Sequence, residues 1–428
     1  MNIFVTGAGG FIGKVLTKHL LDRGYIVSAL VRKPTDISFC HANLHWYVGD
    51  IRNSDFLKKS LVGTEIVIHL AAAKSDEDDS YEINVTGTRN ILTACQQNNI
   101  RGIINVSTIS TKFARKGLYG TTKQKADAVL KDGHVPVVII KPSVVYGDDE
   151  SGILGSLIRY TKLPIVPVIG TGLFKLRPIH VSDVATAIEK ILSQPFSGQY
   201  TIFDLGGPDN ISFNDLVMLV GEKLHNKRVF LLHIPVSVGL VIARVLGFLL
   251  KKPPLSTSNV IATNQEAEIE HESFWKTYNF HPRTLKQGLD ELKTESQSRA
   301  KESHALLSYI AGGKRIDPGQ EKLFEQAIIF YKLHNYSISS FILVSKRRIG
   351  ALDAITKLVY PSGVFQRKLL IGAALIECSP ISSEVLLPRE IGIIRLFMRL
   401  AALTCLSFGK LVYGSFLLCI PHVYKNNV

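Results

Sequence analysis

Short hydrophobic runs alternate with amphipathic helical patterns over the first ~145 residues of the chain. Several runs are continuously apolar, which is typical of parallel strands that helices cover on both faces. This alternation predicts an α/β fold with a doubly wound parallel sheet. The expected strands are Ile3–Thr6, Ile26–Val31, His45–Val48, Ile66–Leu70, Gly102–Val106 and Pro136–Ile140.

The pattern becomes less regular from about residue 147 to residue 293. We expect this segment to form most of a smaller substrate lobe over the strand ends, where doubly wound sheets bind ligands. Lys293–Glu302 is polar and is the expected linker. The sequence therefore predicts one domain over residues 1–295 and a helical, basic and apolar extension over residues 303–428.

Two longer apolar segments interrupt this organisation. Val229–Leu250 is long enough to span a bilayer, but Pro235 and Arg244 break it. Because it lies inside the second lobe, we expect a buried helix that lines an apolar pocket. Such a pocket points to a lipid-like, sterol-like or isoprenoid substrate.

The second apolar segment, Ala401–Ile420, has one charge, Lys410, near its middle. It fits an interfacial or re-entrant helix, a true span or a soluble core helix, and the first is favoured. From Arg299 onward the chain has 17 Lys+Arg and 8 Asp+Glu, so this part carries +9 of the net +14. Basic and apolar together favour an anionic membrane surface over nucleic acid as the partner. We expect residues 385–428 to attach the protein to the cytoplasmic face of a membrane.

The compartment is indicated by the cysteines and by the N-terminus. The five cysteines lack CxxC or metal-like spacing, and unpaired thiols fit a reducing compartment. The N-terminus enters the first strand directly, without a charged and then apolar leader, so no cleaved signal peptide is expected.

A glycine motif follows the first expected strand and leads directly into a helical pattern. Gly7 permits a tight turn, Gly10 lets the backbone approach a pyrophosphate, and Gly13 lets helix and strand pack closely. Unpaired N–H groups at the helix start attract phosphates. This context predicts a dinucleotide site formed by Gly7, Gly10, Phe11, Ile12 and Gly13.

Arg32 stands at the end of the second expected strand, where a carboxylate would bind the ribose hydroxyls of NAD. An arginine cannot accept those hydrogen bonds, but it can bind a 2′-phosphate. We therefore expect NADP(H) to be preferred, with NAD(H) as the alternative. A surface arginine without a role is the other interpretation.

Candidate catalytic residues follow the fifth expected strand. Ser107 and Thr108 end that strand, and Tyr119 and Lys123 share one helix face at i, i+4 spacing. A hydroxyl, a tyrosine and a lysine at a nucleotide-binding edge can move a proton at a substrate oxygen. Tyr119 and Lys123 could also be a solvated pair, and Thr108 an ordinary strand-end cap.

Seven motifs in order resemble one family over roughly residues 1–290. The chain resembles the extended and atypical branches of the short-chain dehydrogenase/reductase superfamily. The motifs are TGAGGFIG from Thr6, VGDIRN from Val48, HLAA from His69, INVTGTRNIL from Ile83, YGTTK from Tyr119, KPSVVYG from Lys141 and RPIHVSDVA from Arg177.

The resemblance implies a role for each matching residue. Tyr119 resembles the general acid/base, and the positive charges of Lys123 and of the oxidised nicotinamide are expected to lower its pKa. Lys123 also resembles the residue that holds the nicotinamide ribose, and Thr108, or more weakly Ser107, the hydroxyl that orients the substrate oxygen. Residues resembling cofactor contacts are Asp50 and Ile51 at the adenine, and Ala71, Ala72 and Pro142 along the cofactor; Asp50 could instead bond its own turn.

The later motif offers candidates of a different kind. Arg177 resembles a phosphate-binding arginine of sugar-nucleotide epimerases, although a plain surface charge is equally compatible. His180 and Asp183 are expected to order the turn before the next helix, and no metal is predicted.

One departure from the family limits the reaction. Ile109 and Ser110 stand where sugar-nucleotide dehydratases have an acidic pair, so dehydration is not expected. The short spacing from Thr108 to Tyr119 resembles the atypical branch, which includes the nucleotide-binding accessory subunit of respiratory complex I. We predict an NAD(P)(H)-dependent oxidoreductase acting on a hydroxyl or carbonyl of a small-molecule substrate. The alternatives are a sugar-nucleotide epimerase with retained cofactor and a non-catalytic cofactor-binding subunit, and a homodimer is compatible with each.

Overall fold

The structure is a computed structural model of the whole chain. It describes residues 1–36, 41–73, 79–147, 153–196, 200–249 and 265–311, together with residues 260, 345 and 347. The chain divides into two compact units, residues 1–37 with 41–293 and residues 38–40 with 294–428. The first unit contains the sheet and the lobe described below.

Seven strands form one sheet in the order β11-β6-β5-β4-β1-β2-β3, and each neighbouring pair is parallel. The order reverses between β1 and β4, so the chain winds outward to both sides from β1. The doubly wound parallel sheet is thus confirmed. The strands are β1 (Asn2–Thr6), β2 (Ile26–Val31), β3 (Leu44–Val48), β4 (Ile66–His69), β5 (Gly102–Val106), β6 (Val137–Pro142) and β11 (Tyr200–Leu205).

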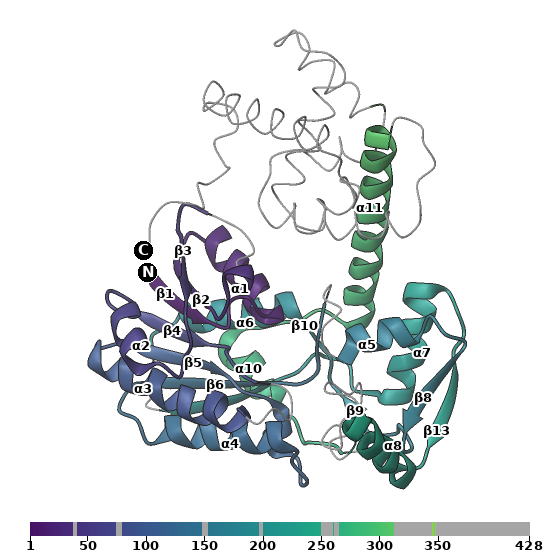
Figure 1. Cartoon of the computed structure of the whole chain (residues 1–428), viewed down its shortest axis with the longest axis horizontal. Helices are drawn as coiled ribbons and strands as arrows, with labels where there is room; N and C mark the ends of the chain where they lie inside the picture. The colour runs from purple at the N-terminus through teal and green to yellow at the C-terminus, as the bar shows by residue number, and fades with distance from the viewer. Residues whose placement is uncertain are drawn as a thin grey trace. The chain divides into compact units, whose positions relative to one another are not determined.

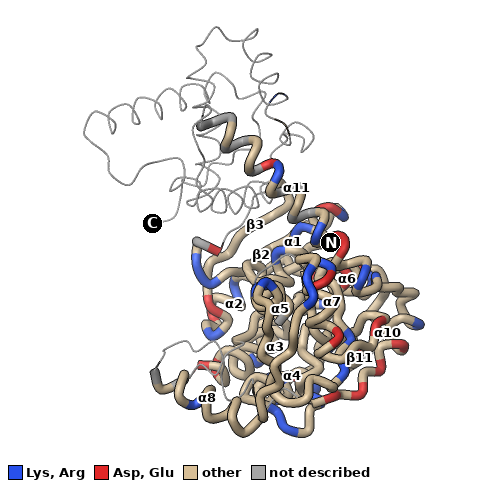
Figure 2. Tube along the Cα trace, turned by 90° about the vertical axis from the view of Figure 1, so that its right-hand side faces the viewer, with Lys and Arg blue, Asp and Glu red and all other residues tan. Residues whose placement is uncertain are grey.

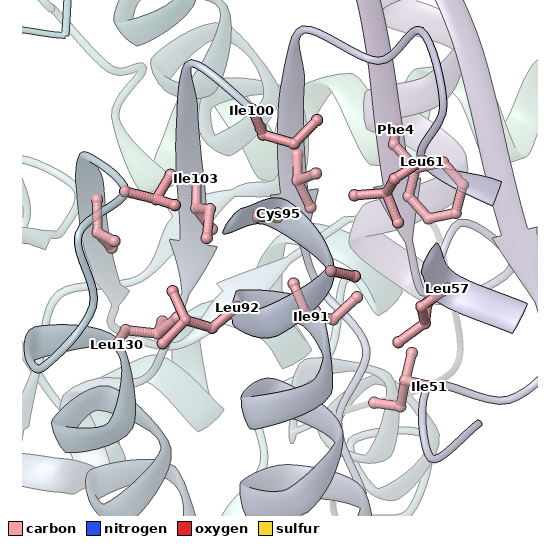
Figure 3. Close-up of a cluster of buried hydrophobic side chains, with 14 of the residues drawn as sticks. Phe4, Ile51, Leu57, Leu61, Ile91, Leu92, Cys95, Ile100, Ile103 and Leu130 are labelled. Atoms are coloured by element: carbon pink, nitrogen blue, oxygen red, sulfur yellow. The ribbon is translucent and has the colours of Figure 1, made fainter. Parts of the chain in front are cut away.

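Helices cover the two faces of this sheet (Figure 1). On one face α2 (Ser54–Ser60), α3 (Gly87–Gln97) and α4 (Leu118–Lys131) pack in a row. On the other, α6 (Val181–Leu192) contacts both α1 (Phe11–Asp22) and α10 (His271–Tyr278). Figure 3 shows the core beneath the first row, where α3 buries its apolar side against the strands. Fully burying one such Leu, Ile or Phe contributes about 1.5–3 kcal/mol.

The seventh strand comes from a segment that the sequence pattern assigned to the second lobe. After β6 the chain enters that lobe, returns through α6 and β11 to the sheet edge, and then leaves again. β11 has only one neighbour, and its first three residues are half-buried or exposed. The continuous apolar run that identified the other strands is therefore missing from it.

The second lobe consists of short elements around a small apolar core. β13 lies parallel to β8, and Tyr146 packs with residues of α5 and α7 in that core. The elements between β6 and α10, apart from α6 and β11, are β7 (Val145–Tyr146), α5 (Ile153–Tyr160), β8 (Ile165–Ile169), β9 (Lys175–Leu176), β10 (Ile179–His180), β12 (Ile211–Ser212), α7 (Phe213–His225), β13 (Phe230–Ile234) and α8 (Val236–Leu249).

The segment Val229–Leu250 is not the buried helix that its composition suggested. Pro235 separates strand β13 from helix α8. In α8, Val241 is 56% exposed and Phe248 is 91% exposed. The expectation of a buried helix is wrong, because the small residues Gly239 and Ala243, and not the large ones, form the inward side of α8.

The expected linker is helical. Lys293–Glu302 lies within α11 (Leu285–Ala311), and the boundary between the two compact units falls at residues 293 and 294. Among the described residues, no helix combines the length and the apolar composition that crossing a bilayer requires. Residues 385–428, with Ala401–Ile420, lie outside the described part of the chain.

Candidate active site

The glycine turn after β1 is packed against the end of β4. Gly7 has a positive φ of 70°, and a Cβ there would lie 2.7 Å from the backbone nitrogen of Ala71. The Gly10 N–H donates to the Gly7 carbonyl at 3.0 Å, and a Cβ on Gly13 would lie 2.2 Å from that same oxygen. Only glycine fits positions 7 and 13, so the turn brings the start of α1 to the point where the strand order reverses.

The start of α1 fits a dinucleotide diphosphate. Gly10 is the N-cap residue and supplies no side-chain cap, and the first turn carries no acidic residue. The first amides of a helix lack partners within it, so those of Phe11, Ile12 and Gly13 are available to phosphate oxygens. The positive end of the helix adds to this attraction.

Thr6 fixes the end of β4 beside the glycine turn. Its hydroxyl accepts the N–H groups of Leu70 and Ala71, each at 3.2 Å, and bonds His69 Nδ1 at 2.8 Å. Burial lowers the pKa of His69 to about 3, so the ring is neutral, and its Nε2 contacts the Thr88 hydroxyl at 3.1 Å. These bonds hold Ala71 and Ala72, the two expected cofactor-lining residues, beside the glycine turn.

Asp50 follows β3 and is held by Arg52. The Arg52 backbone N–H and Nε donate to Asp50 Oδ1 at 2.9 and 3.1 Å, and Nη2 donates to Oδ2 at 2.8 Å. These hydrogen bonds lower the pKa of Asp50, and the charge of Arg32 contributes in the same direction. The local turn bond expected as an alternative is thus present. The carboxylate also stands after β3, at the edge of the sheet where the sequence predicts the nucleotide.

Arg32 and Asp50 follow neighbouring strands, β2 and β3. Arg32 is exposed, and the Gly49 N–H that precedes Asp50 donates to the Val31 carbonyl at 2.9 Å.

Ile51, the residue after Asp50, turns its side chain into the core, where a Cβ on Gly87 would meet it at 2.5 Å. Any adenine contact from Ile51 must therefore come from its backbone.

Lys123 is buried, with 2% of its surface exposed. Its Nζ donates to the carbonyl of Val106, the last residue of β5, at 3.0 Å. The solvated surface pair considered as an alternative is therefore wrong. Tyr119 lies one turn earlier on α4 and is half-buried.

A close backbone approach positions Tyr119. A Cβ on Gly120 would lie 2.9 Å from the carbonyl oxygen of Ser110, in the 3₁₀ turn η3 (Ile109–Lys112). Gly120 thus lets the first turn of α4 lie against η3, which begins directly after Thr108. Sequence analysis assigned no role to this glycine, although it stands inside the YGTTK motif.

Asp127 is a buried carboxylate that the sequence did not identify. Its oxygens accept Ser107 Oγ at 2.7 Å and Asn105 Nδ2 at 3.1 Å, and Lys141 Nζ lies 3.4 Å away. Burial raises the pKa of Asp127, and the charge of Lys123 opposes that rise. The Ser107 hydroxyl donates to Asp127 at 2.7 Å and the Thr108 hydroxyl donates to Ser110 Oγ at 3.2 Å, so either hydroxyl must exchange its partner to donate to a substrate oxygen, and the bond of Thr108 is the longer of the two.

Two features of the fold affect the ionisation of Tyr119. In the protein alone its pKa is raised to about 12, by burial and by the negative charge of Asp127. A positive charge beside the ring would favour the phenolate and oppose this rise. The predicted lowering by Lys123 and the oxidised nicotinamide together concerns the cofactor complex and stays a prediction.

Thr108 and Asn84 shape the turns next to Tyr119. Thr108 Oγ1 accepts the Ser110 N–H at 3.2 Å and so caps η3, as the capping alternative predicted. Asn84, in the π-helical turn η2 (Glu82–Thr86), bonds both backbone groups of Ala73 at 2.8 and 3.1 Å. Its Nδ2 also donates to Thr122 Oγ1 at 2.9 Å, which ties the end of β4 to α4.

Arg177 lies in the second lobe and braces a loop. Its Nη1 donates to the carbonyls of Pro208 at 3.1 Å and Gly207 at 3.5 Å, and the residue is half-buried. His180 caps α6 by accepting the Ser182 N–H. Asp183 accepts Arg283 Nε at 3.1 Å. His180 orders the helix start as predicted, whereas Asp183 lies within the first turn of α6 and holds Arg283. No cluster of three metal-ligating side chains occurs among the described residues.

The candidate residues gather along one edge of the sheet. The glycine turn, Ala71, Thr108 and Pro142 stand at the C-terminal ends of β1, β4, β5 and β6, while Arg32 and Asp50 follow β2 and β3. This is the edge at which doubly wound sheets bind ligands.

The family profile that matches this edge is that of the NAD dependent epimerase/dehydratase family, over residues 3–206. This part of the chain is similar to that family. Enzymes of this family depend on NAD, and they are of the short-chain dehydrogenase/reductase type.

Two relatives and one solved structure show which kinds of protein this chain resembles. The N-acetyl-α-D-glucosaminyl-diphospho-ditrans,octacis-undecaprenol 4-epimerase of Escherichia coli O157:H7 is 26% identical over 328 residues, covering 68% of this chain and 93% of the relative. A putative dihydroflavonol 4-reductase of Synechocystis sp. is 31% identical over 213 residues, covering 42% of this chain and 60% of the relative. The UDP-glucuronic acid 4-epimerase of Bacillus cereus, solved with UDP-glucuronic acid and NAD, has a TM-score of 0.55 at 21% identity over 69% of this chain and 100% of its own, which shows the shared fold.

Proposed function

We propose that this protein catalyses reversible hydride transfer between a nicotinamide cofactor and a hydroxyl-bearing carbon of its substrate. The observation that carries the proposal is Lys123, buried one helical turn from Tyr119 and anchored to the Val106 carbonyl at 3.0 Å. Burying an ammonium is costly, so its place at the cofactor edge favours a function over a surface role.

Tyr119 is the proton donor and acceptor in this proposal. With a pKa near 12 in the protein alone, it holds its proton at neutral pH and is ready to donate to a carbonyl oxygen. When bound, the oxidised cofactor supplies a positive ring charge and accepts the hydride. Thr108 orients the substrate oxygen through its hydroxyl. Ser107 acts indirectly, because its hydroxyl bonds the carboxylate of Asp127 and so fixes that residue.

The cofactor is held by the residues along the strand ends. Backbone amides from Phe11 to Gly13 bind the diphosphate, and Lys123 binds the nicotinamide ribose. Asp50 with the backbone of Ile51 lies at the adenine, and Ala71, Ala72 and Pro142 line the remaining path. These assignments rest on the geometry of the strand ends and on the family resemblance.

NADP(H) is the preferred cofactor in this proposal. Arg32 is exposed at the end of β2, the position from which a side chain reaches the adenosine ribose. Its guanidinium can bind a 2′-phosphate in bidentate fashion, whereas it offers no acceptor to the ribose hydroxyls of NAD.

A lipid-linked sugar 4-epimerase is the second candidate function. The relative that acts on a diphospho-undecaprenol-linked sugar is matched over 93% of its length, so the likeness includes the substrate lobe. In this case the cofactor stays bound through both half-reactions, and Arg177 contacts the substrate diphosphate. Attachment to an anionic membrane surface through residues 385–428 would bring the enzyme to such a substrate, and a homodimer is compatible with it.

One experiment tests both candidates. The purified full chain is incubated with N-acetylglucosaminyl-diphospho-undecaprenol without added cofactor, and separately with ketone and alcohol lipids plus NADPH or NADP⁺. Epimerised sugar in the first reaction supports the second candidate, whereas cofactor-dependent redox conversion supports the first. In either reaction Tyr119→Phe should slow turnover about 10²- to 10⁴-fold, and equal rates for Tyr119→Phe and wild type would contradict both.

A further inference from the structure

Helix α8 of the second lobe packs with its small residues inward and its large residues outward. Gly239 and Ala243, four residues apart, are buried, and a Cβ on Gly239 would lie 3.0 Å from the Ile169 side chain of β8. On the outward side Val238, Val241 and Val245 are 46%, 56% and 51% exposed, and Phe248 is 91% exposed. This is the reverse of the usual arrangement of a surface helix.

The exposed side chains form one continuous apolar strip. Positions 238, 241, 245 and 248 are three or four residues apart and therefore lie on one helix face. The strand that leads into α8 also exposes large apolar side chains, since Phe230 and Leu232 of β13 are 72% and 56% exposed. Contiguous exposed apolar surface of this kind marks an interaction site.

The charge around this strip identifies the partner. Between Glu222 and Glu266 the sequence contains no acidic residue and six basic ones, which are Lys223, Lys227, Arg228, Arg244, Lys251 and Lys252. Figure 2 shows α8 as an almost uncharged projection of the lobe with one basic position. An apolar face in a segment whose charged residues are all basic is complementary to an anionic lipid bilayer, whose interface is apolar inside and negative at its surface.

The length of α8 determines how it meets the bilayer. Its 14 residues extend about 21 Å, which is shorter than the ~30 Å hydrocarbon core. A helix of this length lies in the interface plane and inserts only its apolar side. Beside its first turn an open hollow is lined by the apolar residues Leu173, Ile234, Pro235 and Val236, together with Gly170 and the polar residues Thr171, Asn214 and His233.

We propose that α8, with the exposed side of β13, docks the substrate lobe onto an anionic bilayer by interfacial insertion. This contact is separate from any attachment through residues 385–428 and does not depend on which hydroxyl substrate the enzyme uses. It places the lobe itself, and not only the tail, at the lipid surface.

The test places a reporter on the strip in the full chain. Phe248→Trp is compared with Val62→Trp, whose site is 72% exposed and follows α2 on the nucleotide-binding domain. Both variants keep the native Trp46 and Trp275, so the background emission is matched. Each is mixed with phosphatidylglycerol or phosphatidylcholine vesicles whose acyl chains are brominated near the interface.

With phosphatidylglycerol vesicles we expect blue-shifted and quenched emission for Phe248→Trp and no change for Val62→Trp. Unchanged emission of Phe248→Trp on vesicles that sediment the protein would overturn the proposal and assign attachment to another segment. A blue shift without vesicles that grows with protein concentration would also overturn it, because a second copy would then cover the strip.

A second pair of variants measures what the strip contributes to binding. Val241→Glu combined with Phe248→Glu should weaken vesicle affinity about tenfold or more, whereas Val62→Glu should not. Both sites are exposed, so the fold should tolerate the charges, which circular dichroism checks. Equal vesicle affinity of the double variant and wild type would contradict the proposal, whatever activity either protein shows.

Discussion

The hydroxyl of Ser107 donates to the carboxylate of Asp127 at 2.7 Å, and so joins the end of β5 to the middle of α4. Asn105 and Lys141 contact the same carboxylate from β5 and β6. Lys123 lies one turn before Asp127 on the same helix. The residues proposed for catalysis are therefore held in place by a buried charge that takes no part in the reaction.

Removing this charge should destabilise the protein. Asp127→Asn keeps the shape but leaves the ammonium groups of Lys123 and Lys141 without their buried counter-charge. We expect the free energy of unfolding to fall by about 3 kcal/mol, measured by urea denaturation. Asp132→Asn, at the exposed end of α4, is the matched control and should change stability little. Similar small effects at both sites would contradict the role given to Asp127.

The role of Gly7 in cofactor binding can be tested against a second glycine that has a similar backbone conformation. Gly7 and Gly24 both have positive φ, 70° and 80°, but only the Cβ of an alanine at position 7 would collide with Ala71. Gly7→Ala should abolish cofactor binding, measured by NADPH fluorescence. Gly24→Ala should cost about 1–2 kcal/mol of stability and leave cofactor affinity unchanged. Loss of cofactor binding in both variants would point to general strain in place of a specific site.

Cofactor preference should depend on Arg32. Arg32→Asp removes the 2′-phosphate contact and introduces an acceptor for ribose hydroxyls, so the ratio of NADPH to NADH affinity should reverse. Lys33→Asp makes the same charge change one residue further along and should leave the ratio near its wild-type value. Titration of both cofactors into each variant provides the measurement, and an unchanged ratio in Arg32→Asp would refute the assignment.

Two neutral buried histidines predict a loss of stability in acid. Burial lowers the pKa of His69 to about 3 and that of His180 to about 4. In the unfolded chain both rings take up a proton near pH ~6.5. Between that pH and about 4 the unfolded chain therefore binds more protons, so the free energy of unfolding falls as the pH is lowered. Each histidine contributes up to about 1.4 kcal/mol per pH unit.

Denaturation at several pH values checks this window. His69→Asn should reduce the slope of the free energy of unfolding against pH by the contribution of one proton. His134→Asn, at an exposed site, should leave that slope unchanged. If the slope is the same in His69→Asn and wild type, the neutral buried ring is not its source.

Sequence patterns predicted the sheet well where strands are mostly apolar and buried along their whole length, as in Ile66–His69 and Gly102–Val106. The edge strand β11 was missed because half of it faces solvent. Helix α8 was predicted to be buried from its hydrophobicity, which does not reveal that glycine and alanine form its inner face. Asp127 has no sequence signal, since its partners come from two strands and become visible only in the folded chain.

The ionisation of Tyr119 on cofactor binding tests directly whether this tyrosine faces the nicotinamide. The phenolate difference absorbance of the full chain is recorded against pH, with and without saturating NADP⁺, for wild type and Tyr119→Phe. The account predicts that NADP⁺ lowers the pKa of one tyrosine well below its cofactor-free value of about 12, and that this signal is missing in Tyr119→Phe. Identical cofactor-induced spectra in the two proteins would show that Tyr119 does not face the nicotinamide, and would contradict the proposed mechanism.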